Sequence, residues 1–332
     1  MLMDLLAVVL AIAILTAGAE FFVRGASLLA LRLGVSPLFV GLTVVGFGTS
    51  SPELGASLSA TLAGNPGISV GNVIGSNIFN IGFILGITAL IRPIAVSFPA
   101  VRRDLFIALA IGVLPLLAYV AWGAVPRWLG VGSLAGLFLY LTLAYRADRA
   151  ATQDTQEAAQ MELTDANLAP SAPEALTGWQ TALQLLMGLA GLLMLVGGSK
   201  LFVHAATAIA ERWGISELII GLTIVAVGTS LPELVTSMVA AWRKSADVAV
   251  GNIIGSNIFN VLGILGTCAL VAPQPITAHA GLIGIPVMLL FSAALIPFVR
   301  SGGVLSRREG AVFLVGFVAY SIALAVVAQG DG

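Results

Sequence analysis

Two glutamates lie deep inside apolar stretches of this chain, each within the same short motif. The motif reads Gly-Thr-Ser-x-Pro-Glu, and its copies comprise Gly48, Thr49, Ser50, Pro52 and Glu53, and Gly228, Thr229, Ser230, Pro232 and Glu233. We expect both carboxylates near the middle of a bilayer, where burying one charge costs about 3 kcal/mol. Neither motif contains Lys or Arg. The two glutamates therefore need another source of positive charge.

The rest of the motif favours a hard cation as that source. Proline lacks a backbone donor and breaks the helical ladder, and Gly48 or Gly228 loosens the preceding turn, so we expect bare carbonyls to point into a cavity. Such backbone is tolerated at membrane depth only where it is buried in protein or lines water. Carboxylate, hydroxyl and carbonyl oxygens together suit Ca²⁺, and Na⁺ uses a similar environment. The motifs contain no His or Cys, which disfavours zinc or copper.

A second repeated motif supplies further oxygen donors. It reads Gly-Asn-x-x-Gly-Ser-Asn-Ile-Phe-Asn and begins at Gly71 and Gly251. Ser76 and Asn80 are four residues apart and share a helical face, as do Ser256 and Asn260. An alternative is close helix packing, since small residues and amides commonly join membrane helices. We favour packing for Gly71, Gly75, Gly251 and Gly255, and a structural hydrogen-bonding role for Asn72, Asn77, Asn252 and Asn257.

The motifs belong to a longer internal repeat. An offset of 180 residues aligns the two halves without a gap from Gly18 to Gly86, and 25 of the 46 positions that start at Gly41 and Gly221 are identical. The identities include Gly, Thr, Ser, Pro, Glu and Asn, which a lipid-facing helix avoids. Five predicted helices separate equivalent positions, so the second copy must cross the membrane in the opposite direction. Inverted repeats with a midplane site on interrupted helices are common in secondary transporters.

Composition identifies the elements that carry these motifs as membrane helices. The chain has 332 residues, 58% of them hydrophobic and only 9% charged, against roughly 25% charged residues in globular proteins. A spanning helix needs about 20 apolar residues. We predict an all-α polytopic membrane protein with ten transmembrane helices in two inverted five-helix repeats, at 5–31, 36–61, 69–90, 104–123, 128–145, 180–210, 216–241, 248–271, 280–299 and 309–328.

One polar segment divides the chain. We predict a first repeat over 1–145, a solvated acidic connector over 146–178 and a second repeat over 179–332. The positive-inside rule places both termini outside and the connector in the cytoplasm, because 11 Lys and Arg residues then lie in inner loops and two in outer loops. The total charge is nearly balanced, 15 basic against 16 acidic residues, so we expect no nucleic-acid partner. Nothing in the sequence indicates an obligate protein partner, and the lipid bilayer is the expected environment.

Two further charges lie in the first predicted helix. Glu20 and Arg24 are four residues apart and predict a self-compensating ion pair. Their counterparts in the second half are Lys200 and His204, so the pair breaks the repeat symmetry. We assign it to helix packing or to the cytoplasmic end of the helix.

At both motifs the sequence resembles the cation/Ca²⁺ antiporter superfamily, and within it the prokaryotic sodium/calcium exchangers. The resemblance covers nearly the whole chain and implies a transporter, with no enzymatic activity and no cofactor, in the inner membrane of a prokaryote. It also implies a set of cation ligands, which by motif are Glu53, Glu233, Thr49, Thr229, Ser50, Ser230, Ser76, Ser256, Asn80 and Asn260, with backbone oxygens near Gly46 and Ala226.

These observations predict a secondary antiporter that uses an inward Na⁺ gradient to extrude Ca²⁺ by alternating access. Asn at both positions 80 and 260 weakens a potassium-coupled alternative, because some members of the superfamily, including potassium-dependent exchangers, carry Asp at one or both of these positions. A proton-coupled exchanger is disfavoured by the Thr-Ser pair in each motif and stays open, as does another cation/Ca²⁺ antiporter. A cation channel is the alternative from a different class.

Overall fold

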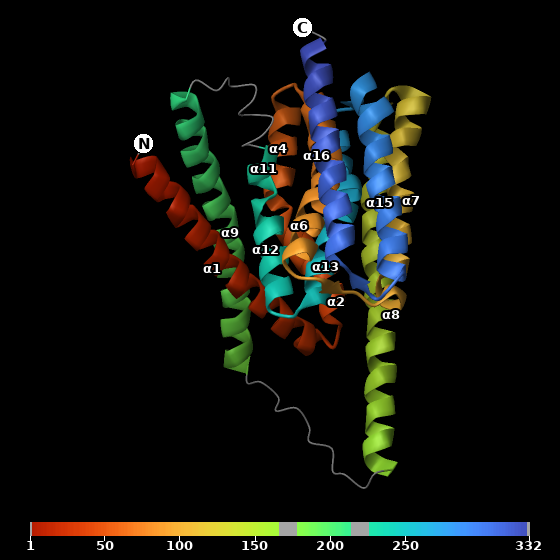
Figure 1. Cartoon of the computed structure of the whole chain (residues 1–332). Helices are drawn as coiled ribbons and strands as arrows, with labels where there is room; N and C mark the ends of the chain where they lie inside the picture. The colour runs from red at the N-terminus through yellow and green to blue at the C-terminus, as the bar shows by residue number, and fades with distance from the viewer. Residues whose placement is uncertain (1, 166–177, 214–225, 331–332) are drawn as a thin grey trace.

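The protein is almost entirely helical, and its helices are long and apolar. The structure, a computed structural model, describes residues 2–165, 178–213 and 226–330 (Figure 1). Within these ranges, seven helical segments are long and apolar enough to cross a membrane: Leu2–Ala30, Pro66–Ile91, Phe98–Trp122, Arg127–Gln153, Ala182–Arg212, Ala246–Val271 and Ala280–Arg300. An integral membrane protein follows from this composition and length. The predicted spans 36–61, 216–241 and 309–328 are not among these seven segments, so the total of ten spans stays a prediction. Residues 216–225 lie outside the described ranges.

The first half of the chain contains continuous and interrupted helices. The continuous ones are α1 (Leu2–Leu33), α7 (Phe98–Trp122) and α8 (Arg127–Asp165). The second predicted span divides into α2 (Pro37–Val40), a π-helical turn η1 (Gly41–Val45), α3 (Gly46–Thr49) and α4 (Ser51–Leu62). The third comprises α5 (Pro66–Phe79), the π-helical η2 (Asn80–Leu85) and α6 (Gly86–Ile91). The interruptions therefore fall on the two motifs.

The second half has a similar order of elements. It comprises α9 (Gly178–Arg212), α11 (Ala226–Thr229), α12 (Leu231–Trp242), α13 (Ala246–Phe259), η4 (Asn260–Ile264), α14 (Leu265–Val271), η5 (Ala280–Gly284), α15 (Ile285–Arg300) and α16 (Arg307–Gly330). The break between α11 and α12 lies at Ser230, 180 residues after the break at Ser50. The turns η2 and η4 begin at Asn80 and Asn260, which are related by the same offset.

Equivalent helices of the two halves run in opposite directions. In Figure 1, α1 descends from the N-terminal end at the top while α9 ascends beside it, and α8 descends while α16 ascends to the C-terminal end. Both ends of the chain lie at the top, and α8 extends to the bottom. The long helices α1 and α9 pack against each other at the edge of the molecule.

Two short antiparallel strand pairs tie loops from the two halves together. Strand β1 (Ile94–Ala95) pairs with β4 (Val304–Leu305), with Ile94 opposite Leu305. Strand β2 (Ala124–Val125) pairs with β3 (Gln274–Pro275), with Ala124 opposite Pro275. Each pair therefore fixes a loop of the first half against a loop of the second.

The segment predicted as a solvated connector is partly a helix. Helix α8 continues without interruption to Asp165, so residues 146–165 of the predicted connector are helical, and the connector itself stays a prediction. This stretch is rich in Ala, Gln, Glu and Arg, which are strong helix formers, and high polarity does not prevent a solvated helix. Residues 166–177 lie outside the described ranges.

Helix α13 packs against the interrupted segment of the first half through glycines. A Cβ atom on Gly255 would lie 2.0 Å from the carbonyl oxygen of Leu42, and one on Gly251 would lie 2.7 Å from that of Leu38. From the other side, a Cβ on Gly46 would lie 2.9 Å from the backbone nitrogen of Ser256. The predicted packing role is therefore confirmed for Gly251 and Gly255. Around Gly71 and Gly75, no described atom comes within 4 Å of such a Cβ.

We predict that Gly255→Ala lowers the stability of the purified protein. The added methyl group meets backbone rather than a movable side chain, and overpacking of this kind costs about 1–3 kcal/mol. Thermal unfolding in detergent measures the effect as a lower midpoint. The control is Gly132→Ala on α8, where no described atom lies within 4 Å of the new Cβ. Equal midpoints for the two variants would contradict the close approach.

Candidate cation-binding site

The two motif glutamates are buried in the centre of the protein, and each is held by a serine from the other half. Glu53 lies in the first turn of α4 and Glu233 in the first turn of α12, and each is 1% exposed. The Ser230 hydroxyl donates to Glu53 Oε1 over 2.7 Å. The Ser50 hydroxyl donates to Glu233 Oε1 over 2.8 Å. The structure therefore brings both motifs together at one place.

The second oxygen of each carboxylate has no hydrogen-bond partner. Among the described residues, Glu53 Oε2 and Glu233 Oε2 are fully buried and unpaired, and neither glutamate forms a salt bridge. The side-chain oxygens Oδ1 of Asn80 and Asn260 are also buried and unpaired within that part of the chain. Buried polar atoms are nearly always hydrogen-bonded. Four orphan oxygens, in two pairs related by the repeat, are what a cation site requires.

Two pairs of asparagine side chains orient two of these oxygens. Asn80 Nδ2 donates to Asn257 Oδ1, and Asn260 Nδ2 donates to Asn77 Oδ1, both over 2.9 Å. Each amide of Asn80 and Asn260 is thereby held by its nitrogen, which leaves its oxygen free to accept. The π-helical turns that begin at Asn80 and Asn260 match a feature that recurs at functional sites.

A second set of amides supports the glutamate backbones. Asn72 Nδ2 donates to Ser57 Oγ over 2.9 Å and to the Glu53 carbonyl over 3.4 Å. In the other half, Asn252 makes the equivalent bonds to Ser237 Oγ and the Glu233 carbonyl, over 2.9 and 3.3 Å. These bonds agree with the predicted structural role of Asn72 and Asn252.

Thr49 and Gly46 lie where α3 meets α13. The Thr49 hydroxyl donates toward Asn252 Oδ1 over 2.9 Å and contacts the Val45 carbonyl over 3.0 Å. The Gly46 carbonyl accepts from Ser256 Oγ over 3.0 Å. Both Thr49 and Ser256 are completely buried. The Gly46 carbonyl, which was predicted as a backbone ligand, therefore lies beside the site and already accepts a hydrogen bond from Ser256.

For the remaining predicted ligands, the structure gives the position in a helix and, for most of them, the burial of the side chain. Ser76 is 6% exposed on α5, one turn before Asn80. Thr229 is the last residue of α11 and Ala226 is its first, and the side chain of Ala226 lies outside the described set. Ser50 and Ser230, at the two helix breaks, are at most 1% exposed.

The helix breaks do not expose the carbonyls that we expected. Pro52 removes the donor that would bond the Gly48 carbonyl, but the Ser51 hydroxyl donates to this carbonyl over 2.7 Å. In the second half, the Ser199 hydroxyl from α9 donates to the Gly228 carbonyl. The prediction of bare carbonyls was therefore wrong at both glycines, because neighbouring hydroxyl groups replace the missing backbone donors.

Two sets of contacts were not predicted from the sequence, one at the site and one away from it. Asn77 and Asn257 were interpreted only as general hydrogen-bonders, although Asn at an interval of three residues in both copies could have indicated paired amides. Away from the site, Arg24 and Glu20 form the predicted pair at 2.5 Å, and Arg243 from the end of α12 joins them at Glu20. No local spacing relates Arg243 to Glu20.

Comparison with known proteins identifies the family. The family model described as "Sodium/calcium exchanger protein" matches residues 3–146 and again residues 183–326. The chain belongs to the sodium/calcium exchanger family. The two matched segments are offset by 180 residues, the same offset that aligns the motifs.

Relatives of this sodium/calcium exchanger family member are similar over nearly their full length. The putative antiporter CaxA of Alkalimonas amylolytica is 38% identical over 98% of this chain and 99% of its own. The sodium/calcium exchanger MaX1 of Methanosarcina acetivorans is 34% identical over 97% of this chain and 98% of its own. A solved structure of the sodium-calcium exchanger NCX_Mj aligns with a TM-score of 0.81 at 29% identity, covering 97% of this chain and 99% of that one. These relatives are transporters rather than enzymes.

We predict that Asn257→Leu weakens Ca²⁺ binding by about tenfold. The variant keeps the shape of the side chain but removes the acceptor for Asn80 Nδ2, and leaving a buried donor unpaired costs about 1–3 kcal/mol. The Asn80 amide then loses its fixed orientation. Isothermal titration calorimetry with Ca²⁺ measures the change. Thr88→Val is the control, because Thr88 is a buried hydroxyl on α6 outside the two asparagine pairs. An equal loss in both variants would contradict a specific orienting role.

Proposed function

We propose that this protein exchanges Ca²⁺ for Na⁺ at the site formed by Glu53 and Glu233, by alternating access, and that it extrudes Ca²⁺ with the energy of the Na⁺ gradient. The observation that carries the proposal is the set of four buried, unpaired oxygens on Glu53, Glu233, Asn80 and Asn260. Membership of the sodium/calcium exchanger family and the likeness to NCX_Mj support the same pair of ions.

The charge of the site gives the ions a reason to compete. With both glutamates ionised, the site carries about −2, which one Ca²⁺ or two Na⁺ ions neutralise. Binding both kinds together leaves an uncompensated positive charge in a medium of low dielectric, where charges interact strongly. Competition therefore follows from the two carboxylates, and it is the property that counter-transport needs.

We infer that the cation ligands are the residues implied by the motifs. The carboxylates of Glu53 and Glu233 would supply the charge, while Asn80 and Asn260 would supply neutral oxygens. The hydroxyls of Thr49, Thr229, Ser50, Ser230, Ser76 and Ser256 and the backbone oxygens of Gly46 and Ala226 complete the proposed set. Ser50 and Ser230 would also position the carboxylates through the bonds that they donate to Oε1.

We further propose ten membrane spans in two inverted five-helix repeats, over 1–145 and 179–332, joined by residues 146–178. Contacts between loops support this topology, since each joins two loops that the ten-span scheme assigns to the same side. The contacts are Arg212 with Asp4, Ser36 with Asp148, Arg92 with the Trp242 carbonyl, Arg127 with the Val271 carbonyl and Arg307 with the Leu90 carbonyl. The strand pairs β1–β4 and β2–β3 obey the same rule.

The proposed orientation in a prokaryotic inner membrane rests on the loop charges. The side that carries the end of α8 would hold 11 basic residues and the side that carries both termini would hold two. Basic loops are retained in the cytoplasm. Both termini are therefore proposed to lie outside the cell.

We predict that Glu53→Gln and Glu233→Gln each reduce Ca²⁺ flux by at least about tenfold, because each removes one of the two charges that hold Ca²⁺. The measurement is ⁴⁵Ca²⁺ uptake into proteoliposomes that contain purified protein and an imposed Na⁺ gradient. Glu309→Gln on α16 is a matched control, since Glu309 is a partly buried acid that bonds Ser306 at a helix start. Normal flux in either site variant would overturn the site.

The same assay separates the proposed exchange from the other mechanisms. Uptake should require Na⁺ on the opposite side of the membrane and should not respond to K⁺ alone. Uptake driven by a proton gradient without Na⁺ would identify a proton-coupled exchanger instead. Uptake that needs no counter-ion would identify a channel.

Cysteine labelling tests the orientation. We predict that Ala147→Cys on α8 is protected from a membrane-impermeant maleimide in right-side-out vesicles, whereas Ala278→Cys, in the loop after β3, is labelled. Both positions are exposed, and the native Cys268 is completely buried, so background labelling should be low. The reversed pattern would show the opposite orientation, and labelling of both sites on one side would contradict the ten-span topology.

A further inference from the structure

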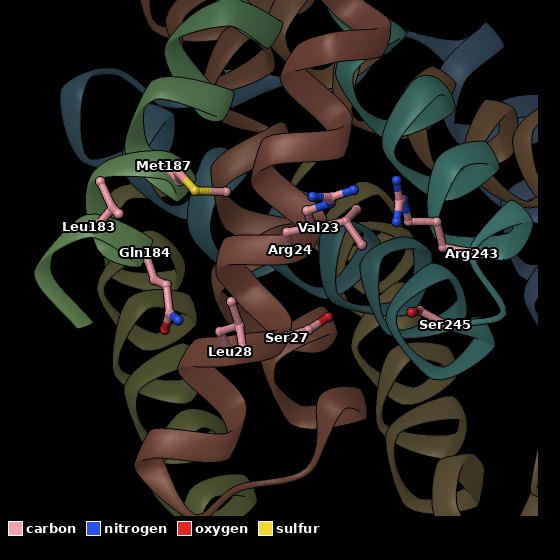
Figure 2. A pocket seen from close by; sticks show the side chains of 9 residues that line it. All are labelled: Val23, Arg24, Ser27, Leu28, Leu183, Gln184, Met187, Arg243 and Ser245. Atoms are coloured by element: carbon pink, nitrogen blue, oxygen red, sulfur yellow. The ribbon is translucent and has the colours of Figure 1, made fainter. Parts of the chain in front are cut away.

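A pocket of about 500 Å³ lies outside the candidate ion site, at one end of α1. Its walls come from α1, from the first turns of α9 and from the turn that joins α12 to α13 (Figure 2). The proposed cation ligands do not line it. The pocket therefore lies between the helix pair α1 and α9 and the C-terminal end of α12.

The polar side of this pocket is built from hydrogen-bond donors with a net positive charge. Arg24 and Arg243 point toward one another in Figure 2, and Ser27, Ser245 and Gln184 also line the space. The lining residues include no acid.

The acid beside this pocket balances only one of the two guanidinium groups. Glu20 contacts Nε of Arg24, and Nε and Nη2 of Arg243. Arg24 and Arg243 side chains are 51% and 41% exposed. Because a guanidinium has five donors, each arginine keeps N–H groups available for another anion. A phosphate group is well matched to two such forks.

The other side of the pocket is apolar and continues onto an exposed helix face. Leu28, Leu183 and Met187 line the pocket. Leu183 is 47% exposed, and Leu186 and Leu193 on α9 are 58% and 64% exposed. An exposed leucine face on a membrane helix contacts lipid chains. A ligand with a phosphate head and a hydrocarbon chain would therefore satisfy both sides at once.

Two tryptophans mark the level of the pocket in the membrane. Trp179, at the start of α9, is 74% exposed, and Trp242, next to Arg243, is 72% exposed. Exposed Trp residues concentrate at the level of the lipid headgroups. The two arginines thus lie where lipid phosphates lie, and the charged leaflet of the cytoplasmic face is rich in anionic lipid.

We propose that this pocket binds the phosphate group of an anionic phospholipid, with Arg24 and Arg243 as its ligands and with one acyl chain that passes Met187 toward the exposed Leu193 on α9. The bound lipid bridges α1, α9 and the α12–α13 turn, so it stabilises their present arrangement. This site is independent of the proposed ion exchange.

The test measures the thermal unfolding midpoint of the full-length protein in micelles that contain phosphatidylglycerol or phosphatidylcholine. We expect phosphatidylglycerol to raise the midpoint and phosphatidylcholine to have no such effect. The variant E20Q/R24Q/R243Q should need about tenfold more phosphatidylglycerol for the same shift, one factor of ten being about 1.4 kcal/mol. Glu20 is included so that no unpaired acid remains.

Two further variants make the result specific. Met187→Trp fills the pocket and leaves the contacts of Glu20 intact, so it should also abolish the shift. Arg149→Gln, at an exposed position on α8, changes the net charge by the same amount as the triple variant and should keep the shift. Equal stabilisation by both lipids, or an unchanged phosphatidylglycerol requirement in either pocket variant, would overturn the proposal. Equal stabilisation by inorganic phosphate in phosphatidylcholine micelles would show that the pocket binds a soluble anion and would overturn the proposal of a phospholipid ligand.

Discussion

The burial of two carboxylates without a basic partner is the constraint on which the rest of this structure depends. Glu53 and Glu233 are each 1% exposed, and an isolated buried charge is costly unless it is paired or coordinates a metal. Within the part of the chain that the structure describes, a serine hydroxyl bonds Oε1 of each carboxylate and Oε2 has no hydrogen-bond partner. This second oxygen is therefore available to a ligand. Under the proposed function, fixed oxygens that need positive charge to be stable would bind a cation and release it in exchange for another.

The way in which the carboxylates are held makes the site a joint product of the two halves. Ser50 bonds Glu233 and Ser230 bonds Glu53, while Asn80 and Asn260 are oriented by Asn257 and Asn77. Neither half contains a complete site, because every one of these bonds crosses between them. The glycines of α13 and of the segment Pro37–Thr49 allow the backbones to approach closely enough for such bonds. These glycines therefore allow the hydrogen bonds between the two halves to form, in addition to increasing the packing density.

The sequence predicted features that depend on local or repeated residues, and it missed contacts that only tertiary packing creates. The repeated motifs predicted buried glutamates and an interruption of the helix beside each proline, and local spacing predicted the ion pair of Glu20 with Arg24, because each depends on residues that are near in sequence or repeated. The bond from Ser199 to the Gly228 carbonyl and the contact of Arg243 with Glu20 join residues whose proximity only the tertiary packing creates. The helix that continues to Asp165 was missed because polarity was given more weight than the helix propensity of Ala, Gln and Arg.

The differences between the halves are as informative as their likeness. In an exact inverted repeat, the two states of an alternating-access cycle would be related by a two-fold rotation about an axis in the membrane plane, and they would be equal in energy apart from differences between the two sides of the membrane. A ligand or contact shifts such an equilibrium only by its differential free energy in the two states. Glu20 and Arg24 are replaced by Lys200 and His204 in the second half, and the π-helical turn Ala280–Gly284 corresponds to a regular stretch of α7. Under the proposed alternating-access mechanism, the symmetric centre would define which ions bind, whereas these unmatched contacts at the periphery would bias the relative stability of the two states.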